Sequence, residues 1–265
     1  MRVRFWGVRG STPTPQKENM GYGGNTSCIE IRTDSNQLLI FDGGTGIRNL
    51  GNELVHEFGD KPISAHIFFS HFHLDHISGL TPFLWGTKWA PQTQHRTKPL
   101  RIFAPAGLRQ LVDAVNDSNN YRLFEQAFPI EIVEVTPDED FEILPGLSAS
   151  TLSTPHTKES LALRLKDEDS KLFVYTSDTG FSEDLAPFAK DAALLLMECS
   201  FRRNKTVQKH LELADAMRVA HDCRPGKLVL THLYAQWDDI DLAAEARALW
   251  LGETIEARDG LVLEL

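Results

Sequence analysis

The chain has few cysteines, no long apolar run and fewer basic than acidic residues. Its three cysteines, Cys28, Cys199 and Cys223, are widely spaced and form no CxxC pair. They predict neither a disulfide framework nor a zinc–thiolate site. No apolar run reaches the roughly 20 residues that a membrane-spanning helix needs, and the first residues do not resemble a signal peptide. We therefore expect a cytoplasmic protein without membrane association.

The formal net charge of -10 argues against binding to long nucleic acids, because phosphate backbones attract basic surfaces. We expect no stable nucleic-acid partner, and the sequence is compatible with a homodimer without specifying one. Two segments nevertheless lack acidic residues, and they are either solvated loops or a positive rim for a small anionic substrate. Their basic residues are Lys88, Arg96, Lys98, Arg101 and Arg109 in the first, and Arg202, Arg203, Lys205 and Lys209 in the second.

Short apolar runs rich in branched and aromatic residues predict buried strands, and apolar residues at helical spacing predict helices. The predicted strands are Ser27–Arg32, Leu38–Phe41, Ala65–Phe69, Arg101–Ala104, Leu161–Leu165, Leu172–Thr176, Ala193–Met197 and Leu228–Thr231. The predicted helices are Ile47–Phe58, Ala106–Val115, Leu211–Asp222 and Ile240–Trp250, with a hairpin around Pro145-Gly146 and polar turns at Asp138–Glu142 and Asp167–Asp169. Because strands and helices are interspersed without a repeat or linker, we expect one α/β domain spanning residues 1–265.

A histidine or an aspartate stands just past the end of four of the predicted strands. These residues are Asp42, which precedes two glycines, His71, Asp178 and His232. Functional groups in open α/β sheets collect at strand ends, because a rigid sheet holds the loops there. The four residues therefore predict a convergent site.

The strongest local signal is the hexad His71–His76 (HFHLDH), which contains four side chains that can bind metals. In extended backbone His71 and His73 point the same way, because side chains alternate with a period of two. Asp75 and His76 lie beyond the next bend and can serve a neighbouring position. The hexad therefore favours a site for two adjacent metal ions over a chance cluster of histidines.

The hexad alone leaves both ions short of ligands, because zinc-type sites use at least three protein ligands. His156, Asp178 and His232 are the remaining candidates, although each taken singly is more often a turn or capping residue. Asp178 is the only carboxylate among them, so it is the natural bridge. We expect two divalent ions, zinc in the first place, with manganese or iron as alternatives.

Taken together, these motifs resemble the metallo-β-lactamase superfamily of binuclear hydrolases, and the resemblance covers nearly the whole chain. It implies a four-layer αβ/βα sandwich. It also implies that Asp42 orients a ligand, the alternative being a turn aspartate before glycines. The implied ligands are His71, His73, His156 and Asp178 for one metal, and Asp75, His76, Asp178 and His232 for the other.

The segment Met197–Phe201 (MECSF) resembles the Glu-Ala-Thr-Phe segment of ribonuclease Z, and His210 resembles the histidine that heads a helix in that family. Glu212 departs from the pattern, since the family has threonine there. The resemblance implies that Glu198 orients and charges His210, which protonates or stabilises the leaving oxygen. A surface carboxylate and a helix-flanking histidine are the alternatives. The candidate catalytic residues are thus Asp75, Glu198 and His210.

The interval from His156 to Asp178 is long enough only for a two-stranded turn, whereas ribonuclease Z enzymes carry a long tRNA-gripping arm there. Residues 7–15 and 22–28 are similar to small bacterial hydrolases compared with cyclic-nucleotide and cyclic-phosphate diesterases. We therefore expect a phosphodiesterase that cleaves small cyclic or linear phosphodiesters through a metal-bridging hydroxide. Hydrolysis of a thioester or lactone on the same metal site is the alternative, and a non-catalytic sensing module is a third interpretation.

Several aromatic residues follow the hexad. Most are expected to pack in the core or in a lid, and one or two are candidates for stacking on a nucleobase. They are Phe83, Trp85, Trp89, Phe124 and Phe128.

Overall fold

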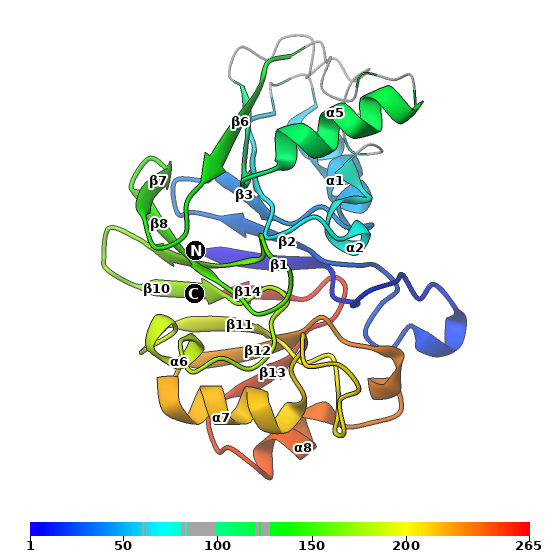
Figure 1. Ribbon diagram of the computed structural model, residues 1–265, viewed down its shortest axis with the longest axis vertical. Coiled ribbons are helices and arrows are strands. Elements are labelled where there is room, and N and C mark those ends of the chain that lie inside the picture. The colour runs from blue at the N-terminus through cyan, green and yellow to red at the C-terminus, as the bar shows by residue number, and fades with distance from the viewer. Residues whose placement is uncertain (60, 62, 81–82, 84–98, 120–121, 123–127) are drawn as a thin grey trace. The chain divides into compact units, whose positions relative to one another are not determined.

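The computed structural model describes the 265-residue chain except residues 60, 62, 81–82, 84–98, 120–121 and 123–127 (Figure 1). The described residues form two compact units. The first comprises Met1–Gly7, Asn25–Val135 and Gly260–Leu265, and the second comprises Val8–Gly24 and Thr136–Asp259. Each unit contains one seven-stranded sheet. The single domain expected for residues 1–265 stays a prediction.

The sheet of the first unit has the strand order β14-β1-β2-β3-β4-β5-β6. Neighbouring strands are antiparallel from β14 to β3 and parallel from β3 to β6. Parallel strands need crossover connections, which here contain the helices α1 (Ile47–Phe58), α2 (Leu74–Ile77) and α5 (Leu108–Asn119). The strands are β1 (Arg2–Gly7), β2 (Cys28–Arg32), β3 (Leu38–Phe41), β4 (His66–Phe68), β5 (Leu100–Pro105), β6 (Ile130–Val135) and β14 (Val262–Glu264).

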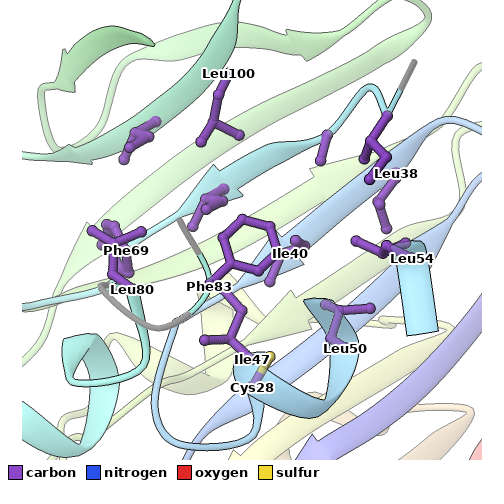
Figure 2. Close-up of a cluster of buried hydrophobic side chains, with 14 of the residues drawn as sticks. Cys28, Leu38, Ile40, Ile47, Leu50, Leu54, Phe69, Leu80, Phe83 and Leu100 are labelled. Carbon is purple, nitrogen blue, oxygen red and sulfur yellow. The ribbon is translucent and has the colours of Figure 1, made fainter. Parts of the chain in front are cut away.

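Helix α1 packs an apolar face onto this sheet. Its residues Ile47, Leu50 and Leu54 recur at helical spacing and are fully buried. They join a hydrophobic cluster with Ile40 of β3, and Figure 2 shows these side chains together. The helix ends at Gly59, whose φ of 53° lies in the left-handed region that glycine adopts without strain.

Two of the aromatic residues that follow the hexad lie in the same core. Phe83 and Phe128 are buried members of the cluster, which confirms core packing for both. The other three, Trp85, Trp89 and Phe124, lie outside the described residues.

The sheet of the second unit has the strand order β13-β12-β11-β10-β9-β8-β7. Its strands are antiparallel from β7 to β10 and parallel from β10 to β13. The helices α6 (Leu185–Phe188), α7 (Leu213–Cys223) and α8 (Leu242–Arg247) connect the parallel strands. The strands are β7 (Asp140–Leu144), β8 (Leu147–Ser153), β9 (Leu161–Lys166), β10 (Leu172–Tyr175), β11 (Leu194–Glu198), β12 (Lys227–Thr231) and β13 (Thr254–Glu256), with short 3-10 helices at Lys17–Asn19 and Ala235–Trp237.

Most predicted elements are present, and β3 and α1 begin and end at the predicted residues. The helix predicted at Ile240–Trp250 is shorter, because the carboxylate of Asp241 caps its start by accepting the Ala244 N–H at 2.7 Å. The helix predicted at Ala106–Val115 begins later, at Leu108, and runs on to Asn119.

One predicted turn is wrong over most of its length, although Asp138 does lie in a turn. The acidic segment Asp138–Glu142 was expected to be a polar turn, but Asp140 and Glu142 belong to β7, where they pair with Ser150 and Ser148 of β8. An exposed strand carries charged side chains on its solvent face, so its acidity did not distinguish it from a turn. The hairpin around Pro145-Gly146 joins these two strands as predicted.

Among the described residues, no helix combines the length and the apolarity that crossing a bilayer requires.

The burial of α1 leads to a stability prediction. Replacing Leu50, which is fully buried, with alanine should lower the free energy of unfolding by about 2–5 kcal/mol, because the neighbouring side chains cannot fill the cavity completely. The neighbouring exposed residue provides the control, and Asn49→Ala should change stability by less than about 0.5 kcal/mol. Urea unfolding followed by circular dichroism measures both, and equal losses would contradict the assigned packing.

Candidate metal centre

Asp42 is the polar centre of the first unit. It follows β3 with a φ of 56°, a left-handed conformation that aspartate tolerates better than most residues. Its carboxylate accepts the Ser70 N–H at 2.8 Å and the Ser70 hydroxyl at 2.9 Å. It also lies 2.8 Å from Nδ1 of His76. Because an ionised carboxylate only accepts, His76 Nδ1 carries the proton and Nε2 presents its lone pair. Asp42 therefore contacts a histidine of the hexad, as expected of a residue that orients a ligand.

The Ser70 hydroxyl extends this constraint to His71. Its single proton is directed to Asp42, so the oxygen accepts from His71 Nδ1, which lies 3.1 Å away. His71 consequently also presents Nε2. The ring centroid of His71 lies 4.8 Å from that of His73 and 4.2 Å from that of His76. The hexad thus gathers three imidazoles.

Glycines allow the hexad to pack against the end of β3. The chain enters α2 after His73, and Asp75 Oδ2 lies 3.4 Å from His76 Nε2. A Cβ atom at Gly44 would lie 2.1 Å from the carbonyl oxygen of Asp75, and one at Gly79 would lie 2.0 Å from the carbonyl oxygen of Gly44. Side chains at these two positions would therefore separate the segments that carry Asp42 and the hexad.

Asp178, His156 and His232 converge in the second unit. Asp178 follows β10 and His232 follows β12, at the carboxyl ends of two strands that both run parallel to β11 between them. His232 Nε2 lies 3.1 Å from Asp178 Oδ1, and His156 Nε2 lies 3.6 Å from Asp178 Oδ2. Two atoms bound tetrahedrally to one zinc ion at about 2.1 Å are roughly 3.4 Å apart. The two carboxylate oxygens thus face different imidazoles at the spacing of ligands that share an ion.

Oxygen atoms also hold Nδ1 of both these histidines. His156 Nδ1 donates to the backbone carbonyl of Lys209 at 2.8 Å. The Ser200 hydroxyl donates to Glu198 at 2.7 Å, so it accepts from His232 Nδ1 at 2.9 Å. Both histidines therefore present Nε2, the atom that faces Asp178 in each case.

Glu198, the last residue of β11, contacts a serine and a histidine in the second unit, as Asp42 does in the first. One carboxylate oxygen lies 2.9 Å from His210 Nδ1, and the other accepts the Ser200 hydroxyl. Three backbone N–H groups also donate to this carboxylate, at 2.7, 3.2 and 3.4 Å. Glu198 is only 1% exposed, so it is not a surface carboxylate. The His210 ring stacks on that of His232 with 5.4 Å between centroids. The predicted Glu198–His210 pair therefore exists, and its catalytic role stays a prediction.

Two residues of this region had no predicted role. The Ser200 hydroxyl contacts both Glu198 and His232. Strand alternation places residues 198 and 200 on one side, and this was the signal in the sequence that could have indicated the contact with Glu198. Tyr234 lies two residues beyond His232, with its ring centroid 5.8 Å from that of His210. Burial raises the pKa of Tyr234 above 10.0, so the phenol stays protonated at neutral pH.

Ion pairs neutralise part of the predicted positive rim in the second unit. Arg202 pairs with Glu245, and Lys205 pairs with Asp215. Glu245 and Asp215 both lie outside the acid-free segment, so a segment without acidic residues does not form a surface without them. Arg203 and Lys209 of the same segment are exposed.

In the first unit, Arg101 lies 3.4 Å from Glu131, and Arg109 donates to the backbone carbonyl of Ile132 at 2.8 Å. Lys88, Arg96 and Lys98 lie outside the described residues. The rim therefore stays a prediction for the first basic segment.

The interval between His156 and Asp178 is described completely. It contains β9 and β10, which pair antiparallel with each other through a short turn after Lys166. The turn predicted at Asp167–Asp169 is confirmed. No long arm is inserted in this part of the chain, in agreement with the sequence.

Comparisons with known proteins agree with this architecture. Residues 39–233 match the family described as the beta-lactamase superfamily domain. A ribonuclease Z of Haloarcula marismortui is 28% identical over 314 residues, covering 98% of this chain and 96% of that protein. The probable metallo-hydrolase YhfI of Bacillus subtilis is 26% identical over 269 residues, covering 100% of each chain.

Solved structures show the same fold. The crystal structure of the metallo-beta-lactamase fold protein YhfI from Bacillus subtilis matches with a TM-score of 0.78 and 22% identity, covering 100% of this chain and 98% of that one. Zn(2+)-bound PqqB from Methylobacterium extorquens matches with a TM-score of 0.75 and 17% identity, covering 100% of both chains. The predicted α/β metallo-β-lactamase fold is thus confirmed. Since the family match spans most of its length, the chain belongs to the beta-lactamase superfamily and is a hydrolase of that superfamily.

Proposed function

We propose that this hydrolase is a binuclear metal-dependent phosphodiesterase that cleaves small cyclic or linear phosphodiesters. Asp178 would be the ligand common to both ions. One ion would be held by His71, His73, His156 and Asp178, and the other by Asp75, His76, Asp178 and His232.

The observation that carries this proposal is the common orientation of four histidines. In His71, His76, His156 and His232 an oxygen atom holds Nδ1, and Nε2 presents its lone pair. Histidines that bind metals almost always donate their other N–H to a carboxylate, a carbonyl or a similar acceptor, which fixes the tautomer and the ring direction. The donor set therefore fits divalent ions.

The donor chemistry also bears on which metal binds. Imidazole and carboxylate together suit zinc, and they also accept manganese or iron. We propose zinc first, and the likeness to Zn(2+)-bound PqqB supports this choice. When bound, such ions supply Lewis acidity and lower the pKa of a bound water to about 7.

The chain's own residues would then manage the leaving group. His210 is held through Nδ1 by Glu198, so its Nε2 is the atom that can give a proton to a departing oxygen. The Glu198 carboxylate complements the charge that an imidazole acquires when it carries two protons. A phosphodiester with an alkoxide leaving group needs such a proton, whereas a thioester does not, and this pair therefore favours the phosphodiester. The relative named ribonuclease Z is consistent with that choice.

The remaining parts of the proposal concern size, charge and location. The short β9–β10 connection supports a small substrate rather than a folded nucleic acid. Arg203 and Lys209 are the exposed cations that would attract an anion in the second unit. Three buried free cysteines support a reducing, cytoplasmic location. A homodimer and the absence of a stable nucleic-acid partner stay part of the proposal.

Removing Asp178 should remove the metal. The purified wild-type chain should contain about two divalent ions, and Asp178→Ala should lose most of both, because each ion loses a ligand. The exposed Asp184 provides a matched control, since Asp184→Ala should keep both ions. Elemental analysis of protein prepared without chelators measures the content. Metal-free wild type, or a fully loaded Asp178→Ala variant, would contradict the ligand set.

Removing His210 should separate two classes of leaving group. His210→Ala should keep both ions and lose about 10²–10⁴-fold in turnover of a dialkyl phosphodiester, because an alkoxide needs a proton to depart. A nitrophenyl diester should lose much less, since nitrophenolate leaves without one. His221→Ala is the control, because its side chain is 78% exposed on α7.

The outcome also tests the alternative chemistry. Equal losses on both diesters would refute His210 as the proton donor. If the wild type cleaved thioesters or lactones efficiently and no diester at all, the phosphodiesterase proposal would be wrong and the thioester or lactone alternative would replace it.

The charge argument predicts a difference between two neighbouring arginines. Arg203→Ala should raise KM for an anionic diester roughly twofold to fivefold, whereas Arg202→Ala should do less, because Glu245 already neutralises Arg202. A neutral ester should be cleaved equally well by both variants. Arg218→Ala serves as a remote control, since that residue pairs with Glu183. Steady-state kinetics at low and high salt measure the effect, and identical changes for both substrates would mean that Arg203 is a solvated surface residue.

A further inference from the structure

A segment near the N-terminus lies against His232. Within the second unit, Leu233 donates its N–H to Val8 O at 2.8 Å, and Gly10 donates to Leu233 O at 3.4 Å. A Cβ atom at Gly10 would lie 2.5 Å from Cε1 and Nδ1 of His232 and 2.8 Å from the Tyr234 ring. Only glycine allows this approach, so residue 10 brings the backbone onto the face of a proposed metal ligand.

Arg9 anchors this segment from inside the unit. Its side chain is fully buried, and Nε donates to Gly23 O at 2.7 Å. The guanidinium also donates to Asn19 O and pairs with Asp238, which follows the 3-10 helix Ala235–Trp237. A buried arginine with several acceptors holds its surroundings in one geometry. The position of the next residues, Gly10 and Ser11, is therefore well defined.

Ser11 and Tyr234 form a hydroxyl pair at this place. Their oxygens are 3.0 Å apart, and Ser11 is exposed. The Tyr234 ring packs edge-on against Phe201 and His210, with centroid distances of 5.1 and 5.8 Å. Ser11 has a φ of 59°, which glycine adopts more easily.

The Tyr234 hydroxyl also hydrogen-bonds Ser200, and the two hydroxyls together have more hydrogen-bonding positions than these contacts use. Each hydroxyl has one donor and two acceptor positions. The pair lies next to His210, the residue that we assign to the leaving oxygen, and it is accessible at Ser11. An apolar ester arm beside the pair could not hydrogen-bond to it. An arm that carries a hydroxyl could replace its hydrogen bonds to water with hydrogen bonds to Ser11 and Tyr234.

We infer that Ser11 and Tyr234 form a specificity subsite that binds a hydroxyl on the leaving ester arm of the substrate. The natural leaving group would then be a polyol or a sugar rather than an alkyl alcohol. This inference rests on the proposed phosphodiesterase function, and it adds the class of leaving group.

The test compares two diesters of similar length, bis(3-hydroxypropyl) phosphate and dibutyl phosphate. Wild type should prefer the hydroxylated diester in kcat/KM. Tyr234→Phe keeps the ring packing and removes the hydroxyl, so it should lower kcat/KM for that diester about threefold to tenfold and leave dibutyl phosphate within about twofold. Ser11→Gly, which accepts the positive φ, should do the same. Tyr22→Phe, which removes a hydroxyl that donates to Ile240 O, is the matched control and should change neither.

A binding measurement separates this inference from the function on which it rests. Calorimetry with the monoesters 3-hydroxypropyl phosphate and butyl phosphate should give the same preference in wild type and its loss in Tyr234→Phe. If wild type cleaves neither diester but shows this preference, the subsite stands and the phosphodiesterase proposal fails. If Tyr234→Phe and Ser11→Gly weaken both members of each ligand pair equally, or change neither, the subsite is refuted.

Discussion

Two buried carboxylates set the proton positions on which the candidate site depends. Each stands at a strand end, accepts one serine hydroxyl, and lies against Nδ1 of one histidine. Because a hydroxyl has a single proton, the serine that donates to the carboxylate must accept from the next histidine. One carboxylate thus fixes two imidazoles in each unit. The residues are Asp42 with Ser70, His71 and His76, and Glu198 with Ser200, His210 and His232.

This arrangement follows from the topology of the sheets. In both units the strands become parallel halfway across the sheet, and crossover connections deliver the next strand end to the same edge. Polar groups gathered there are buried, and a buried carboxylate without donors would be strongly destabilising. Asp42 and Glu198 are satisfied by backbone N–H groups and hydroxyls that the same strand ends supply. In both sheets, therefore, donors from the strand ends satisfy a buried carboxylate in the same way.

The sequence predicted the parts of this arrangement that depend on local pattern. The apolar runs located most central strands, and the hexad located three neighbouring imidazoles. Short or solvent-facing strands such as β6 and β13 were missed. They contain exposed polar side chains, so their sequences resemble those of loops. The ion pairs of Arg202 and Lys205 were missed, because both partners lie outside the basic segment and only the fold brings them to it.

The roles of the serines were harder to predict for a different reason. Ser70 and Ser200 are ordinary residues in the sequence, and their function appears only when the acceptor of each hydroxyl proton is known. Asp42 was ambiguous between a turn and an orienting residue for the same reason. The structure resolves that ambiguity through one contact, the 2.8 Å distance to His76 Nδ1.

The three histidines of the second unit differ mainly in what holds Nδ1. A backbone carbonyl holds His156, a hydroxyl holds His232, and a carboxylate holds His210 directly. A neutral acceptor fixes the tautomer without favouring a second proton, which suits a metal ligand. A carboxylate complements positive charge as well, which suits a group that carries and releases a proton. All three rings present Nε2, and the carboxylate behind His210 agrees with its proposed role as the acid of this unit. A carboxylate alone does not distinguish an acid from a ligand, because Asp42 holds the proposed ligand His76 in the same way.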